Sequence, residues 1–238
     1  MTHKRYFLLL LLLFIPVAIW AAINPVDRAD WALENVLVVV FLLGLIVSFA
    51  KFPLSRVSYT LIFIFLFLHE IGSHYTYALV PYDDWFKSLT GHTFNSLFGF
   101  ERNHFDRLVH FSYGLLLAYP IREVFIRIAN VKGFWSYFLP LDLTMSTSMI
   151  YELVEWGAAI GFGGELGMAY LGTQGDVWDA HKDMALASLG ALIAMMIVAM
   201  INIRLQRDFA QEWNESLSVR HSKPLGEDEI ARMMDEVA

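Results

Sequence analysis

The stretch YFLLLLLLFIPVAIWAAI, residues 6–23, contains no charged side chain and closely follows Lys4 and Arg5. A helix needs about 20 mostly apolar residues to cross the hydrocarbon core of a membrane, so this stretch predicts a transmembrane helix. A cleaved signal peptide is the alternative, because the stretch has a basic start and small residues, Ala21 and Ala22, near its end. Removal of this segment would leave five spans.

Five more apolar segments follow: residues 31–50, 54–74, 106–121, 134–160 and 180–203. The fourth of the six spans is short for a full crossing. The chain has 238 residues, of which 57% are hydrophobic and 17% charged, which is the composition of a membrane protein. We therefore predict an all-α, polytopic membrane protein with about six transmembrane helices in one bundle over residues 1–205. Residues 206–238 form a polar tail.

The charge and the cysteine content exclude several classes of function. The net charge of −7 comes without any basic stripe, so the sequence predicts no nucleic-acid partner. Cysteine is absent, which excludes disulfides, thiolate metal sites and a cysteine nucleophile.

Lysine and arginine residues near the span ends predict the orientation, because cytoplasmic loops are enriched in them. If the N-terminus is inside, nine lie on the cytoplasmic side: Lys4, Arg5, Lys51, Arg56, Arg122, Arg127, Lys132, Arg204 and Arg207. Five lie on the other side: Arg28, Lys87, Arg102, Arg107 and Lys182. The excess predicts that both termini and the tail are cytoplasmic.

The segment YELVEW, residues 151–156, places Glu152 and Glu155 about one helical turn apart in the fifth span. A carboxylate at membrane depth costs several kcal/mol unless it is paired. In the predicted topology three more polar clusters reach the same outer level: His69, Glu70 and His74; Arg102, Asn103, Asp106, Arg107 and His110; Asp176, Asp179, His181, Lys182 and Asp183. Within each cluster, residues three or four apart share a helix face, so we expect an inward-facing polar group on four helices.

Carboxylates outnumber cations in this group, and a buried surplus of negative charge needs protons or a bound cation. Histidine combined with Asp and Glu suits Zn, Mn or Fe. We predict that a divalent metal ion is held by Asp106, His110, Glu152, Asp179, Asp183 and His74. Glu155 or Glu70 would act as general base. The predicted substrate contacts are Arg102, Arg107, Asn103, Lys182 and Asp176, and the two arginines suit an anionic group.

Simpler interpretations exist for some of these residues. Asp106 and Asp176 precede apolar runs, where an acid commonly caps a helix N-terminus. Arg102 and Arg107 could serve only as ion-pair partners for the acids. Asp183 and His110 lie a turn deeper, so capping does not explain them.

The segment HEIGSH superficially resembles the metalloprotease motif, which requires His-Glu-x-x-His. His69 and His74 are instead five residues apart, so on a continuous helix they point about 140° apart. They could bind one ion only if the helix broke, for example at Gly72. Between this segment and the fourth span, residues 75–105 are rich in aromatic residues, which indicates either an interfacial belt or a lid over the polar group.

Four segments carry a family resemblance: HEIGSHYTY, RNHFDRLVHFSYG, YELVEW and QGDVWDAHKDM. Together they resemble the YjdF-type family of bacterial inner-membrane proteins, over about residues 30–203. The resemblance implies a small multi-pass protein of the bacterial cytoplasmic membrane and carries no assigned activity.

More distantly, FDRLVHFSYGLLLA resembles a segment of VanZ-like membrane proteins. Later acidic positions of that pattern would fall on Glu152 or Glu155 and on Asp179 with Asp183. Arg107 and Asp183 replace a Lys and an Asn of the pattern, so the resemblance leaves the ligand set open. VanZ-like proteins are associated with glycopeptide (teicoplanin) resistance, which implies a role in the cell envelope.

The sequence thus favours a metal-dependent hydrolase or transferase that acts at the outer membrane face on a lipid or lipid-linked envelope substrate. The alternative is a proton- or cation-coupled transporter that uses the same acids and histidines as a relay. A relay requires polar residues in the cytoplasmic half, where Asp142 is the main one. A third interpretation is a non-catalytic protein whose polar group only fastens the helices.

Overall fold

The computed structural model describes residues 1–164, 167, 171, 173–206, 208–219 and 226–237. These residues form helices and connecting loops, with no strand among them. The helices are α1 (His3–Ala22), α2 (Arg28–Ser48), α3 (Arg56–His74), α4 (Tyr82–Thr90), α5 (Phe94–Phe98), α6 (Phe105–Ile128), α7 (Trp135–Phe162), α9 (Asp179–Leu205), α10 (Phe209–Ser216) and α11 (Glu227–Asp235). The predicted all-α class is confirmed for the described residues.

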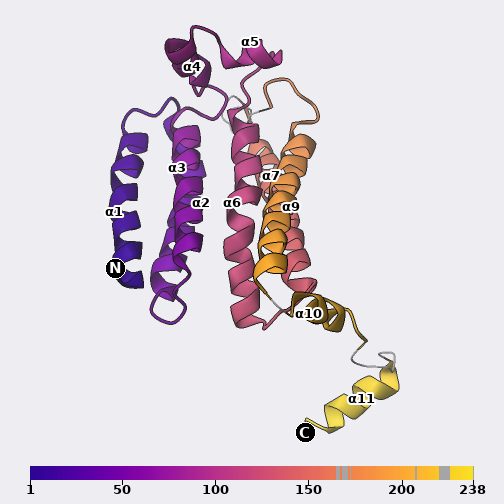
Figure 1. Cartoon of the computed structure of the whole chain (residues 1–238). Helices are drawn as coiled ribbons and strands as arrows, with labels where there is room; N and C mark the ends of the chain where they lie inside the picture. Colours follow the sequence, from indigo (N-terminus) through magenta and orange to yellow (C-terminus); the bar gives the residue numbers. More distant parts are fainter. Residues whose placement is uncertain (165–166, 168–170, 172, 207, 220–225, 238) are drawn as a thin grey trace.

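The long helices α1, α2, α3, α6, α7 and α9 stand side by side (Figure 1). The short helices α4 and α5 lie at one end of this bundle, and α10 and α11 lie at the other. The chain starts at the end that carries α10, so both termini are at the same end (Figure 1). Within the described residues, α1, α2, α3 and α9 are long and apolar enough to cross a membrane.

Helix α6 is longer than the sequence predicted. It continues through Pro120 and spans 24 residues, or about 36 Å at 1.5 Å per residue. The expected span, residues 106–121, is therefore part of a longer helix, which is not among the four helices of the described chain that are long and apolar enough to cross a membrane. The charged residues that follow belong to the helix, where Arg127 pairs with Glu123 one turn earlier at 2.8 Å.

Helix α3 connects the two halves of the bundle, because it packs against α1 and α2 on one side and against α6 on the other. Its contact with α1 is aromatic, because the ring of Phe7 on α1 lies 4.7 Å from the ring of Tyr59 on α3. The Phe7 ring also lies 4.9 Å from that of Phe49, the residue that follows α2. Many large apolar side chains on the other faces of these helices are exposed, as expected for surfaces that meet lipid.

Helices α6 and α9 pack closely through small residues. A Cβ added to Gly114 would overlap the backbone carbonyl oxygen of Ala187, and one added to Gly190 would overlap that of Phe111. Ala187 is fully buried in the same contact region. Small residues let two membrane helices approach to backbone contact. This contact fixes the position of α6 relative to α9 along the helix axes. It therefore also fixes the relative positions of the polar residues that lie one turn further along the two helices.

The first part of the tail packs on the bundle. Glu212 on α10 accepts a hydrogen bond from the Gly133 backbone N–H at 2.8 Å, and Trp135 donates to the Ser216 carbonyl at 2.9 Å. The Trp213 ring lies 5.4 Å from the Phe134 ring. Helix α10 is therefore anchored at the start of α7.

Candidate metal centre

The polar residues converge because of the directions in which their helices run. Helices α6 and α9 begin, and α3 and α7 end, at the end of the bundle that carries α4 and α5 (Figure 1). Asp106 and His110 lie on the first two turns of α6, Asp183 lies on the second turn of α9, and Glu152 lies toward the end of α7. The predicted convergence of these residues from separate helices is present in the structure.

The centre of the group is formed by Asp106, His110 and Asp183. One ligand atom from each lies within 4.8 Å of the others. His110 Nε2 is 3.5 Å from Asp106 Oδ1 and 3.7 Å from Glu152 Oε1 on α7. An ion placed between these atoms would need only small side-chain shifts to reach bonds of about 2.0–2.2 Å. We call Asp106, His110, Asp183 and Glu152 the acid–histidine cluster.

Two oxygens of the cluster have no hydrogen-bond partner among the described residues, Asp183 Oδ1 and Glu152 Oε1, and both are buried. Asp183 is 2% exposed and Glu152 is 9% exposed. A buried polar atom without a partner costs about 1–3 kcal/mol, and more when it is charged. A proton or a cation would remove this cost. One imidazole with several carboxylates suits Zn, Mn or Fe.

Next to the cluster, two arginines tie the loop before α9 to the start of α6. Arg102 Nη2 lies 2.6 Å from Asp179 Oδ1, and Arg107 Nη2 lies 2.5 Å from Asp176 Oδ2. Lys182 Nζ also reaches Asp176 Oδ2, at 2.6 Å. We call these five residues the ion-pair clamp. Asp179 and Asp176 are thus neutralised by cations of the chain itself.

The clamp shifts two pKa values in the loops. The hydrogen bond from Lys182, then that from the Trp178 backbone N–H, hold the pKa of Asp176 well below its usual range. Burial lowers the pKa of His104, and the guanidinium groups of Arg107 and Arg102 lower it further. His104 Nδ1 lies 3.2 Å from Arg107 Nη1, a contact in which the neutral imidazole accepts the hydrogen bond.

Asn103 connects neighbouring loops through hydrogen bonds. Its side chain donates to the Val80 carbonyl at 2.8 Å and accepts from the Phe105 backbone N–H at 2.9 Å, while its own backbone N–H donates to Gln174 at 3.2 Å. Asn103 therefore joins three connections at the end of the bundle.

His74 does not join the acid–histidine cluster. Helix α3 is continuous to His74, so Gly72 supplies no break. His74 Nδ1 is 3.1 Å from the Ala21 carbonyl oxygen, and its ring stacks on Trp20 with centroids 4.5 Å apart. It fastens α3 to α1. His69 points elsewhere and contacts the Tyr77 hydroxyl through Nδ1 at 2.6 Å.

The two predicted general bases differ in position. Glu155 lines two cavities, each of which also reaches Asp106. Glu70 is fully buried, and neither of its carboxylate oxygens has a hydrogen-bond partner within the described part of the chain. Glu70 lines neither cavity. Of the two, Glu155 is therefore the residue that a molecule in these cavities can reach.

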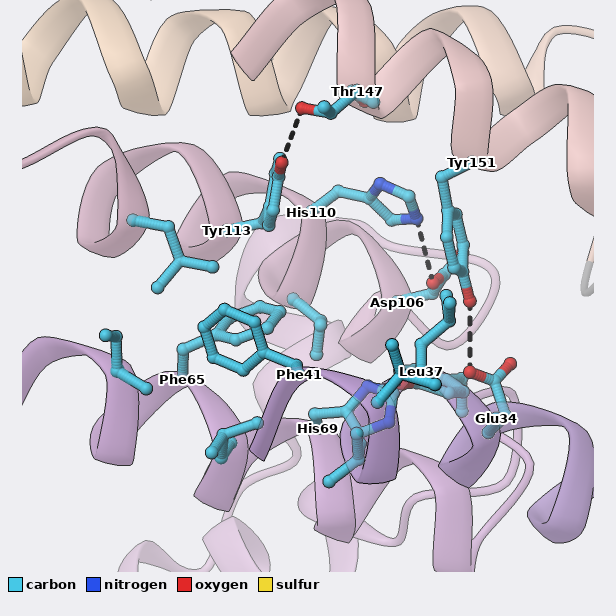
Figure 2. A pocket seen from close by; sticks show the side chains of 18 of the residues that line it. Glu34, Leu37, Phe41, Phe65, His69, Asp106, His110, Tyr113, Thr147 and Tyr151 are labelled. Carbon is cyan, nitrogen blue, oxygen red and sulfur yellow. Dashed lines mark hydrogen bonds and ion pairs between the residues drawn. The ribbon is translucent and has the colours of Figure 1, made fainter. Parts of the chain in front are cut away.

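Sequence reasoning missed two acids on α2. The buried residues of this helix are Asp30, Glu34 and Val38, spaced by four on one face. Glu34 accepts a hydrogen bond from the Tyr151 hydroxyl at 3.0 Å, as Figure 2 shows. Burial, and then the nearby carboxylates of Glu34 and Asp106, raise the pKa of the loop residue Tyr77 well above its usual range. An acid inside an apolar span was the signal that could have identified Glu34.

A cavity of about 580 Å³ lies between α2, α3, α6 and α7. Figure 2 shows Glu34, His69, Asp106, His110 and Tyr151 gathered in one part of it and Phe41, Phe65 and Tyr113 in another. A second cavity of about 660 Å³ lies between α7 and α9 and contains Glu152, Asp179 and Asp183. The acid–histidine cluster therefore stands between two cavities.

Comparisons with known proteins show the family to which the chain belongs. The family described as predicted membrane protein (DUF2238) matches residues 6–204. Inner membrane protein YjdF of Escherichia coli (strain K12) is 34% identical over 194 residues, which cover 81% of this chain and 88% of that protein. No solved structure matches the chain at a significant level. The predicted YjdF-type resemblance is thus confirmed: this chain belongs to the DUF2238 family and is a multi-helix protein of the bacterial inner membrane.

Proposed function

We propose that the protein binds one divalent ion, Zn, Mn or Fe, at the acid–histidine cluster and is a metal-dependent hydrolase or transferase. Its substrate would be a lipid or lipid-linked envelope molecule. The observation that carries the proposal is the cluster itself: Asp106, His110 and Asp183 offer ligand atoms within 4.8 Å of one another. The unpartnered oxygens of Asp183 and Glu152 support it.

The proposed topology has six spans with both termini in the cytoplasm. Helices α6 and α7 stand beside the four apolar helices and have comparable or greater length. Both chain ends lie at the end of the bundle that carries α10 (Figure 1). The excess of lysine and arginine near that end supports a cytoplasmic position for it. The cluster would then lie near the outer face.

The proposed ligand set is narrower than the sequence predicted. Asp179 is engaged by Arg102 at 2.6 Å, and His74 is held by α1 through the Ala21 carbonyl oxygen. We therefore assign the metal to Asp106, His110, Asp183 and Glu152. Arg102 and Arg107 hold Asp179 and Asp176 in place, so we assign them to shaping the site instead of binding an anionic headgroup.

Glu155 is the proposed general base. It lies about one helical turn from Glu152 on α7, and both cavities reach it. A bound divalent ion would make a water molecule easier to deprotonate near neutral pH and would polarise the bond to be cleaved. Glu155 would accept the proton from the attacking water or hydroxyl and return it to the leaving group.

The test is a lipid-conversion assay on metal-loaded protein in vesicles of bacterial inner-membrane lipid, with mass spectrometry of all lipid classes over time. We expect one class to be consumed. Glu155→Gln should keep its metal and lose about 10²–10⁴-fold of the rate, the usual contribution of a general base. Asp142→Asn is the matched control, because Asp142 lies exposed on α7. Unchanged lipids with loaded wild type, or full rate in Glu155→Gln, would contradict the proposal.

A proton relay is the second candidate. Its support is a set of polar contacts inside the bundle: Tyr151 donates to Glu34, and the Tyr113 hydroxyl lies 2.6 Å from Thr147 Oγ1. Asp142 is the main polar residue expected on the cytoplasmic half of such a path, but its side chain lies on the exposed surface of α7. Proton flux through protein-containing liposomes, measured with an internal pH dye, would favour the relay over the enzyme.

A further inference from the structure

The 580 Å³ cavity extends far beyond the acid–histidine cluster. Its lining runs along α6 from Asp106 to Val124 and along α2 from Asp30 to Leu45. Asp106 and Val124 are 18 residues apart on one helix, which corresponds to about 27 Å at 1.5 Å per residue. This length approaches the roughly 30 Å thickness of a membrane's hydrocarbon core. The cavity is therefore a long channel parallel to the helices.

Most of the channel is apolar. Beyond the polar end, its lining is formed almost entirely by aliphatic and aromatic residues: Leu37, Val38, Phe41, Leu45, Leu54, Ile62, Phe65, Leu66, Leu117, Pro120, Ile121 and Val124. A volume of 580 Å³ spread over about 27 Å of helix length gives room for an extended hydrocarbon chain along the channel.

The channel has access to the bilayer along α2. Lining residues Leu37 and Val40 are 50% and 62% exposed, so the wall that they form is also a surface of the bundle. Helix α2 contacts α3 and otherwise shows little packing, with Asp30, Glu34 and Val38 as its buried residues. A chain in the surrounding lipid could enter by a small displacement of this helix.

The polar end of the channel is acidic. Carboxyl groups from three helices line it: Asp30 and Glu34 on α2, Asp106 on α6 and Glu155 on α7. No lysine or arginine lines the channel within the described part of the chain. Arg102 and Arg107, the nearest candidates, are engaged in the ion-pair clamp. A cation bound at this end would therefore stabilise these carboxyl groups in their ionised form.

An unpartnered histidine nitrogen adds a second observation. His69 is 8% exposed and lines the channel. Its Nδ1 contacts the Tyr77 hydroxyl, whereas its buried Nε2 makes no hydrogen bond of normal geometry within the described residues, the nearby Glu34 backbone included. In Figure 2 the His69 ring lies beside Glu34, among the side chains of the polar end. A ligand with hydrogen-bonding groups at this end would satisfy this atom.

We propose that the channel binds an amphiphile with one linear hydrocarbon chain and an amine-bearing, cationic head. The head lies between Glu34 and Asp30, and the chain extends past Leu37, Phe65 and Leu117. This places the bond between head and chain beside the acid–histidine cluster. That the amphiphile is a substrate rests on the proposed function. Its binding requires only the channel.

The test uses photo-crosslinking of the full chain in phosphatidylcholine nanodiscs. Three probes share one 16-carbon chain with a diazirine near its middle and differ in the head: a primary amine, a carboxylate and an alcohol. We expect the amine probe to label peptides of α2 and α6 at least fivefold more than either other probe. Excess unlabelled hexadecylamine should remove this labelling, and palmitate should not.

Matched variants separate the two ends of the channel. Val38→Trp should fill the apolar part and reduce amine labelling at least fivefold, since Val38 lines the channel and is 6% exposed. Val39→Trp is its control, because Val39 is 55% exposed and lies outside the lining. Glu34→Gln should reduce the preference for the amine over the alcohol at least threefold, with Asp142→Asn as the control for a lost charge.

Equal labelling of wild type by the three probes, or a preference for the carboxylate, would overturn the proposal. So would undiminished labelling of a folded Val38→Trp variant. If that variant does not fold, the competition between hexadecylamine and palmitate on wild type decides the question. Metal content is measured on the same samples, so selective amine labelling without metal refutes only the proposed function. Bound metal without selective labelling refutes only this inference.

Discussion

His110 Nε2 on α6 and Glu152 Oε1 on α7 lie 3.7 Å apart. Together with Asp183 on α9, they bring three helices to one point at the end of the bundle. Each of the three residues is at most 9% exposed. Burial of several acids around one imidazole is costly unless a cation or protons compensate, and this cost is the basis of the proposed ion site.

The close approach of α6 and α9 should be essential for the cluster. A side chain at position 114 would overlap the Ala187 backbone, so we expect Gly114→Val to destabilise the protein by about 3 kcal/mol, the upper range for overpacking. Gly44→Val is the control, because a Cβ at Gly44 meets nothing within 4 Å. Unfolding by a graded denaturant in detergent measures both. Equal stability of the two variants would contradict the packing described.

The ion-pair clamp should contribute more through its arginines than through its lysine. Arg107 is 16% exposed and Lys182 is 48% exposed. We expect Arg107→Gln to cost about 1–3 kcal/mol, because Asp176 and Asp179 lose a buried partner. Lys182→Gln should cost less than about 1 kcal/mol, as exposed ion pairs do. Thermal unfolding in detergent measures the stability lost in each variant. A larger loss in Lys182→Gln than in Arg107→Gln would refute the prediction.

The clamp should also loosen in acid. Burial and the nearby Arg107 lower the pKa of His104. A lowered pKa means that the unfolded state binds the proton more readily than the native state does. The contribution of His104 to the free energy of unfolding is therefore fully present above about pH 6.5, the ordinary pKa of histidine. It decreases as the pH falls below that value. Asp176 adds a further loss of the same sign only below about pH 4.

Hydrogen exchange of the peptides around residues 100–106 and 173–179, compared at pH 7.5 and pH 5.5 after correction for intrinsic rates, measures this loosening. We expect faster exchange at the lower pH in wild type. His104→Gln should remove most of the difference. Exchange that slows as the pH falls would contradict the sign of the effect.

The orientation can be tested with single cysteines, because the chain contains none. Leu89→Cys on α4 and Val219→Cys after α10 both occupy highly exposed positions, 85% and 82%. In cells with a permeabilised outer membrane, a membrane-impermeant maleimide should label position 89. Position 219 should react only after the inner membrane is opened. The reverse pattern would place the cluster at the cytoplasmic face.

Much of this arrangement could be predicted from the sequence. Apolar segments, the period of the acidic and histidine residues, and alternating helix directions together predicted that Asp106, His110, Glu152 and Asp183 meet at one end. Helical spacing specifies which residues share a face, and span direction specifies their height in the membrane. These two kinds of information do not depend on loop geometry.

Other features depend on contacts that the sequence does not encode locally. The engagement of Asp179 by Arg102 depends on how the loop before α9 folds over the start of α6. His74 faces α1 because α3 continues without a break at Gly72. The role of Glu34 follows from the position of α2 across the channel, which neither apolar pattern nor span direction specifies.

The most direct measurement is the metal content of protein purified in detergent and reloaded with Zn, Mn or Fe, determined by elemental mass spectrometry. The comparison includes Asp106→Asn, Asp183→Asn and the exposed control Asp142→Asn, all checked for native folding by size-exclusion chromatography. Our account predicts about one equivalent of metal in wild type and in the control, and at least tenfold less in the two cluster variants. Folded wild-type protein that binds no metal after reloading would contradict it.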